Sequence, residues 1–295
     1  MKKSTLLATA VFAFVAGRQI YDRNINIDPN GILKHRIVKE ATPANRFAAI
    51  DYIKVMQNIE SQAWVASDLT SKLTNMNLDD TILKELERLA KCDDFVFLES
   101  DPYVANKLDS RARNLISLPT NFWNGVTYLQ AKAFQVNSEE SYYWLSLALK
   151  LNKNLNDHSI HSLLISTRLA INNTVEVANY LKTQGINNNK YVNEWGNVLK
   201  SYTSDDYMAA IASEFHNFNT SVDTFINLPN FVNNIAINVV CMPNSHIRDS
   251  GLGLLNKLDS SSPYFHQTNN FPAFYNIDTD FQEYYTKSKN ALLKI

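Results

Sequence analysis

Glycine is scarce in this chain, at only 7 of 295 residues, where a typical protein has a share of ~7%. All-β proteins, dinucleotide-binding folds and phosphate-binding loops use glycine at tight turns and close backbone approaches. The shortage therefore argues against all three. Apolar residues make up 45% of the chain, which is enough for a sizeable core and argues against wholesale disorder.

No charge of one sign dominates, since 28 Lys and Arg against 29 Asp and Glu give a net charge of −1. No block rich in Lys or Arg stands out, and binding of a phosphate backbone needs clustered positive charge. We therefore expect no nucleic-acid partner. The zinc motif HExxH is absent as well, and no signature of a cofactor is present, so no cofactor is expected.

Cysteine is also rare, and the only two are Cys92 and Cys241. In an oxidising compartment they could form one disulfide. Closing so long a loop would contribute about 4–5 kcal/mol in the chain-entropy model. Two buried free thiols are the alternative.

One apolar run lies near the N-terminus, and it is short. It is the uncharged stretch of residues 4–17, which follows Lys2 and Lys3 and ends at Arg18. A transmembrane helix needs about 20 apolar residues, so this run fits the apolar region of an export signal or a short membrane anchor. Residues 1–17 are interpreted as one of these two.

Cleavage and retention of this segment remain open. Val15 and Gly17 supply small residues at −3 and −1 for cleavage before Arg18. In the other case the segment stays in the membrane as an anchor. Either way, the positive-inside rule places the rest of the chain in the periplasm or facing it from the inner membrane of a bacterial envelope. A buried first helix of a cytosolic protein is the third interpretation.

Helical periodicity dominates the remainder, and the pattern predicts no strand. Residues 18–42 read as a linker, 43–227 as an α-helical domain, and 228–295 as a less regular region that ends in a helix and packs on the same domain. The fold class is all-α: an irregular bundle or an array of helical hairpins with about nine to eleven helices.

Several helix ends are marked by capping residues. Thr42-Pro43 predicts the start of a long helix that runs to about Thr74. Asp79 or Asp80 caps the next helix. Another helix is expected from Asn156 or Asp157 to about Asn172, and Gly185 is expected to end the helix after it.

Residues 121–136 and 138–152 form a compact helix-turn-helix unit. The end of its second helix, Ala148-Leu149-Lys150-Leu151-Asn152, resembles the second helix of a tetratricopeptide repeat. The resemblance covers about 32 residues. The unit departs from the repeat pattern at the three positions Leu129, Ser141 and Lys153. An ordinary helical hairpin with Trp144 and Leu147 in the core is the alternative.

Two histidines, His158 and His161, are spaced to share one face of a helix and could hold a metal ion. A third ligand is needed, and no nearby Glu or His supplies it. The favoured interpretation is that Asp157 caps a helix whose first turn exposes both histidines, so no metal site is expected.

Two Glu-Ser pairs, at Glu60 and Glu99, are similar to the catalytic Glu-Ser of lytic transglycosylases. The resemblance implies a buried carboxyl group acting as general acid and base on a glycan. The Gly-Leu-Met-Gln element of that family follows neither pair, so both are weak candidates for a catalytic residue.

Aromatic residues are frequent, with 14 Tyr, 15 Phe and 4 Trp. Some could line a binding surface for a sugar or a peptide, although wedges between helices are the more common role. The candidates for such a surface are Tyr142, Trp144, Tyr264, Phe274 and Tyr275.

The sequence favours a helical protein of the cell envelope, exported or tethered, that acts as a scaffold, chaperone or adaptor. Its expected partner is another envelope protein, and it contacts the membrane through residues 1–17 if these are not cleaved. The alternative is an envelope glycan hydrolase or lyase with one catalytic carboxylate. The absence of catalytic motifs argues against an enzyme without deciding the question.

Overall fold

A computed structural model describes residues 32–40, 42–59, 68–96, 122–156, 158, 160–213, 216 and 281–295. The chain divides into two compact units. The first unit comprises Met1–Arg36 and Met208–Gln282, and the second comprises Ile37–Tyr207 and Glu283–Ile295. In the first unit, the described residues include the short 3-10 helix η1, Ile32–His35, and helical residues 208–213.

The second unit holds most of the described residues. Across the described part of the chain all regular structure is helical, which confirms the predicted all-α class. The helices, in chain order, are α2 (Pro43–Ile59), α3 (Leu69–Asn75), α4 (Asp80–Ala90), α8 (Asn124–Val136), α9 (Glu140–Leu155), α10 (Ile160–Ser166), the π-helix η2 (Thr167–Asn172), α11 (Asn173–Thr183), α12 (Val192–Lys200) and α16 (Phe281–Leu293).

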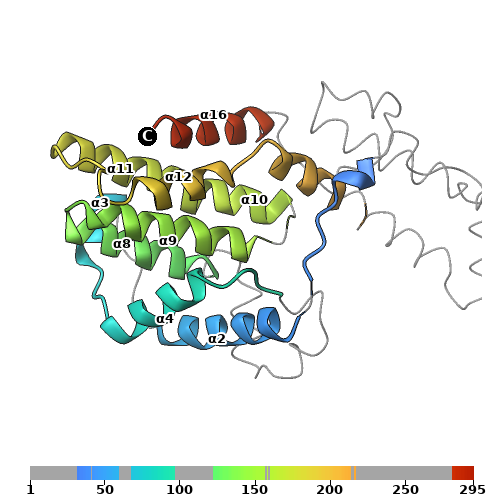
Figure 1. The fold of residues 1–295 in the computed structure, drawn as a ribbon, viewed down its shortest axis with the longest axis horizontal. Coiled ribbons are helices and arrows are strands. Elements are labelled where there is room, and N and C mark those ends of the chain that lie inside the picture. The colour runs from blue at the N-terminus through green and yellow to red at the C-terminus, as the bar shows by residue number, and fades with distance from the viewer. Residues whose placement is uncertain are drawn as a thin grey trace, which may run out of the picture. The chain divides into compact units, whose positions relative to one another are not determined.

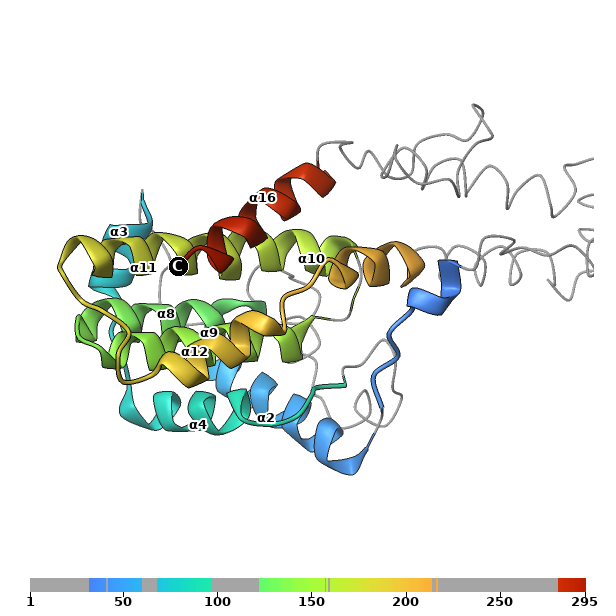
Figure 2. The same cartoon turned by 45° about the horizontal axis from the view of Figure 1, so that its top comes forward.

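The hairpin of α8 and α9 forms the centre of the second unit. Helices α2 and α4 lie on one side of it, and α10, α11 and α16 lie on the other (Figures 1 and 2). The turn between α8 and α9 is built on Asn137, whose φ of 47° is left-handed. Asparagine tolerates this conformation better than most residues. The predicted helix-turn-helix unit is therefore present as a hairpin, and its likeness to a tetratricopeptide repeat stays a prediction.

The predicted single helix from Thr42 to Thr74 is wrong in its extent. Thr42 does cap the start, because its hydroxyl accepts a hydrogen bond from the Asn45 N–H at 3.2 Å. Helix α2 is described only to Ile59, and a separate helix, α3, begins at Leu69. Asp68 caps the start of this second helix, because its backbone is extended and its side chain accepts a bond from the Ser71 N–H at 2.7 Å.

Other predicted helix ends are confirmed. Asp79 caps α4 by accepting bonds from Thr81 N–H at 2.7 Å and Ile82 N–H at 3.1 Å. Gly185 follows α11 with a left-handed φ of 75°. The Ile186 N–H then donates back to the Leu181 carbonyl, as in a helix-ending turn.

A π-helix interrupts the expected helix before Asn172. Helix α10 begins at Ile160, later than predicted, and η2 joins it directly to α11. A π-helix displaces carbonyl groups from their usual partners. Here the buried Gln130 amide reaches over from α8, with Nε2 3.2 Å from the Leu169 oxygen and 3.1 Å from the Ala170 oxygen. The side chain of α8 thus supplies the donor that these carbonyls need.

Candidate functional site

Two ion pairs lie near the C-terminal end of α9. Lys153 Nζ is 2.6 Å from Asp206 Oδ1, and Lys39 Nζ is 2.6 Å from Asp94 Oδ1. The Asp206 side chain is only 7% exposed and that of Lys153 is 24% exposed. Together with His158, whose pKa responds to all four residues, these groups are called the polar clasp. They join four separate stretches of the chain.

His158 is the unusual member of the polar clasp. Its φ of 61° is left-handed, and its N–H donates to Asn156 Oδ1 at 2.9 Å. Its Nδ1 is buried and has no hydrogen-bond partner among the described residues. Burial lowers the pKa of His158, and the charges of Lys39 and Lys153 lower it further.

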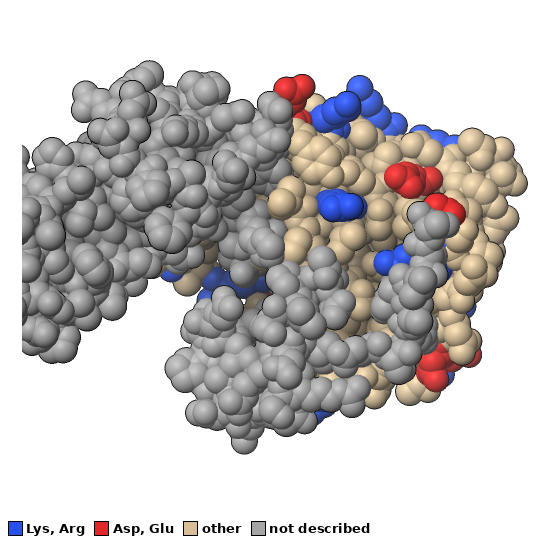
Figure 3. All heavy atoms as spheres, turned by 180° about the vertical axis from the view of Figure 1, so that it is seen from behind, with Lys and Arg blue, Asp and Glu red and all other residues tan. Residues whose placement is uncertain are grey.

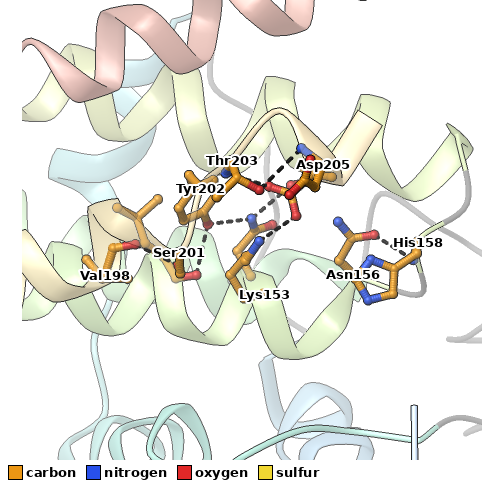
Figure 4. A network of polar contacts seen from close by, with 12 residues as sticks. Lys153, Asn156, His158, Val198, Ser201, Tyr202, Thr203 and Asp205 are labelled. Atoms are coloured by element: carbon orange, nitrogen blue, oxygen red, sulfur yellow. Dashed lines mark hydrogen bonds and ion pairs between the residues drawn. The ribbon is translucent and has the colours of Figure 1, made fainter. Parts of the chain in front are cut away.

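The polar clasp continues into a buried network (Figure 4). Lys153 points toward Tyr202 and Thr203, and its Nζ lies 4.9 Å from the centre of the Tyr202 ring. The Tyr202 hydroxyl donates to the Leu149 carbonyl at 2.9 Å and accepts from Asn152 Nδ2 at 2.8 Å. The network therefore ties α9 to the turn that follows α12.

Asn152 is the centre of that network and is fully buried. Its Oδ1 accepts from Trp123 Nε1 at 2.8 Å, and its Nδ2 donates to Ser166 Oγ and to the Tyr202 hydroxyl, each at 2.8 Å. One amide thus satisfies three buried polar groups from α10, the turn after α12 and the residue before α8. Such a fully bonded amide fixes how these segments meet.

A second cluster lies on the surface where α4 and α9 meet the residues before α12. The Tyr143 and Tyr191 rings are 5.4 Å apart, and Lys91 and Lys190 lie 5.7 Å and 5.1 Å from the centres of these respective rings. The Tyr143 hydroxyl donates to Glu87 Oε1 at 2.5 Å. These five residues are called the aromatic face.

One of the two lysines of the aromatic face, Lys91, is paired with an acid. Lys91 Nζ also bonds Glu87 Oε1 at 2.7 Å. The hydrogen bonds from Lys91 and Tyr143 lower the pKa of Glu87. The neighbouring Val192 is 57% exposed. This surface therefore brings an exposed apolar side chain, two tyrosines and two lysines close together.

Two of the predicted aromatic binding residues lie elsewhere. Tyr142 is 1% exposed and Trp144 is 7% exposed, so both are core residues, and they do not form an open surface. A turn of 100° per residue places their neighbour Tyr143 at the surface instead. The other three candidates, Tyr264, Phe274 and Tyr275, lie outside the described residues.

The weak catalytic candidates Glu60 and Glu99 also lie outside the described residues, as does Cys241. The glycan-cleaving alternative and the Cys92–Cys241 disulfide therefore stay predictions. Cys92 is partly exposed, and its Sγ lies 3.7 Å from the Arg88 carbonyl oxygen.

The spacing of His158 and His161 predicted that both lie in the first turn of a helix. The structure does not place His158 there. His158 precedes α10 in a left-handed conformation, and the side chain of His161 lies outside the described part of the structure. Within the described ranges, no three His, Cys, Asp or Glu side chains gather closely enough to hold a metal ion.

Figure 3 shows the face opposite to that in Figure 1. In its described part most of the surface is uncharged, and Lys, Arg, Asp and Glu side chains occur at several separate places. No helix in the described ranges is both long and apolar enough to cross a membrane.

No protein-family model, curated protein or solved structure matches the chain.

Proposed function

We propose that this chain is an exported or membrane-tethered helical protein of the cell envelope that binds another protein through the aromatic face. The observation that carries the binding proposal is the group of Tyr143, Tyr191, Lys91 and Lys190 at the surface. Tyrosine supplies a large apolar area at low entropy cost, and it is enriched at protein interfaces.

The geometry of the aromatic face supports this role. Tyr143 is held by its bond to Glu87 and by the neighbouring Tyr191 ring, so its orientation is fixed before a partner arrives. Pre-ordered side chains lose less entropy on binding. Lys190 and the exposed Val192 add a charged and an apolar contact beside the rings.

The proposed compartment rests on the N-terminal sequence. Lys2 and Lys3 followed by the uncharged residues 4–17 are typical of an export signal or a short anchor. The helical hairpin of α8 and α9 is an architecture that can present such a face rigidly, whether or not it belongs to the tetratricopeptide type.

We expect Tyr191→Ala to weaken capture of the partner by about tenfold or more, as loss of one anchoring tyrosine does at many interfaces. The full chain, tagged at its C-terminus and crosslinked in its native cells, is purified and its bound proteins are quantified. The variant removes one ring of the aromatic face and no buried hydrogen bond recorded in the structure.

Tyr180→Ala is the matched control. Tyr180 is also partly exposed and also stacks on a ring, that of Phe134 at 4.7 Å, but it lies on α11, away from the aromatic face. The proposal predicts that this control captures as much partner as the original chain. Equal capture by both variants and the original chain would refute the role of the aromatic face.

A further inference from the structure

Helix α16 lies at the edge of the second unit and packs on it through one narrow stripe (Figure 1). The buried side chains of this stripe are Tyr285, Ser288 and Leu292, spaced three and four residues apart on one face of the helix. All other side chains from residue 283 onward are partly or fully exposed. The central helix α9, in contrast, buries twelve of its sixteen residues. Apolar burial therefore holds α16 much less firmly than α9.

Two tyrosine hydroxyls supply directed bonds between α16 and the rest of the second unit. The Tyr285 hydroxyl donates toward Asp206 Oδ2 at 3.0 Å and toward the Thr203 carbonyl oxygen at 3.1 Å. The Tyr284 hydroxyl accepts from Asn172 Nδ2 at 2.8 Å. A hydrogen bond to a carboxylate is stronger than one between neutral groups. The contact between Tyr285 and Asp206, called the latch, is therefore the main directed attachment of α16.

The acceptor side of the latch is built without help from α16. Asp206 Oδ1 pairs with Lys153 Nζ at 2.6 Å, and Asp206 Oδ2 accepts from the Thr203 N–H at 3.2 Å. Lys153 belongs to the central helix α9 and lies over the Tyr202 ring at 4.9 Å. If Tyr285 leaves, the carboxylate keeps a cation and a backbone donor, so no unpaired charge is left buried. Asp206 is therefore held ready to accept Tyr285 again.

The latch also lies next to two points where the chain passes between its compact units. The long segment of the first unit begins at Met208, two residues after Asp206, and ends at Gln282, three residues before Tyr285. The bond between Asp206 and Tyr285 thus ties together the two ends of the segment Met208–Gln282. Without this bond, only the Met208 end stays next to a firmly packed part of the second unit.

We propose that α16 is a strap that opens and closes on the second unit, with the Tyr285–Asp206 bond as its latch. Little apolar surface is exposed when α16 detaches, and the acceptor side of the latch stays in place, so opening is local and reversible. In the closed state both ends of Met208–Gln282 are held at the second unit. In the open state only one end is held, so the strap sets how tightly this segment is tethered.

Hydrogen–deuterium exchange of the full chain, read on peptides from α16 and from α8, tests the latch. Tyr285→Phe removes the hydroxyl and keeps the buried ring. Because a bond to a carboxylate is lost, we expect α16 to exchange about tenfold faster or more. Tyr180→Phe is the matched control, since the Tyr180 hydroxyl has no recorded hydrogen bond among the described residues, and it should leave α16 unchanged. Equal exchange of α16 in the original chain and in Tyr285→Phe would show that the latch does not hold the strap.

Gly125→Ala tests whether the strap opens independently of the rest of the second unit. The new Cβ would lie 2.9 Å from Tyr52 Oη and 3.1 Å from Leu86 Cδ2, which strains the packing of α8 on α2 and α4. We expect faster exchange in α8 and no change in α16, because this packing stays formed when only the strap opens. If exchange in α16 rises by the same factor as in α8, α16 detaches only when the whole unit unfolds, and the proposal is wrong.

Low concentrations of guanidinium give a second test that needs no variant. Denaturant promotes an opening in proportion to the surface that the opening exposes. In the original chain, exchange of α16 should therefore rise much less steeply with guanidinium than exchange of α8. The same steep dependence for both helices would contradict a local opening.

Discussion

Replacing Asn152 with Leu is expected to lower the free energy of unfolding of the second unit by about 3–5 kcal/mol. Leucine has a similar volume, so the loss comes from unmade hydrogen bonds. The Trp123 indole N–H would lose its acceptor, and Ser166 and Tyr202 would lose a donor, all inside the core. A buried polar group left without a partner costs about 1–3 kcal/mol.

Guanidinium unfolding measured by tryptophan fluorescence checks this prediction, because Trp123, Trp144 and Trp195 are all buried in the second unit. Asn179→Leu is the control, since Asn179 is exposed on α11. Surface changes of this kind usually stay within about 0.5 kcal/mol. If Asn152→Leu lowered the free energy of unfolding no more than Asn179→Leu does, the network would not hold the helices together.

The substitution Gly→Ala is expected to change the free energy of unfolding in opposite directions at two helical positions. In α8, a Cβ on Gly125 would lie 2.9 Å from Tyr52 Oη and 3.1 Å from Leu86 Cδ2. Tyr52 is fixed between Phe95 and Phe122, whose ring centres lie 5.6 Å and 5.5 Å away, so it cannot give way easily. We expect Gly125→Ala to destabilise the unit by about 1–3 kcal/mol.

Gly196→Ala in α12 is the matched comparison. A Cβ at Gly196 meets no atom within 4 Å, and alanine favours a helix interior over glycine by about 0.5–1 kcal/mol. This variant should therefore be slightly more stable than the original chain in the same guanidinium measurement. If Gly125→Ala were also stabilising, the close contact between α8 and Tyr52 would be wrong.

Local signals in the sequence predicted the helices well where a capping residue dominates. Thr42, Asp79 and Gly185 each mark a helix end that the structure confirms. The break at Asp68 was missed because the apolar spacing before it continues through the expected helix. The π-helix was not predicted because Gln130, whose side-chain amide donates to its carbonyl groups, lies 39 residues before Leu169 in the sequence.

The candidate surface and the buried polar network were harder to predict from the sequence. The sequence indicated Tyr142 and Trp144 as candidate surface aromatics, but which side of α9 faces outward depends on where the helix meets its neighbours. The partners of Asn152 and Asp206 could not be assigned from the sequence, because Trp123, Tyr202 and Tyr285 lie far along the chain. Polar residues within an apolar helix, such as Asn152 between Leu149 and Leu155, are the clue that could have shown the network.

Export is the central claim, because the envelope partner and the predicted disulfide both depend on it. The most direct measurement is the mature N-terminus, read by mass spectrometry from the tagged full chain after fractionation of its native cells. We predict recovery in the periplasmic or membrane fraction, starting at Arg18 if residues 1–17 are cleaved or retaining them if they act as an anchor. Recovery of the uncleaved chain in the soluble cytosolic fraction would contradict the account.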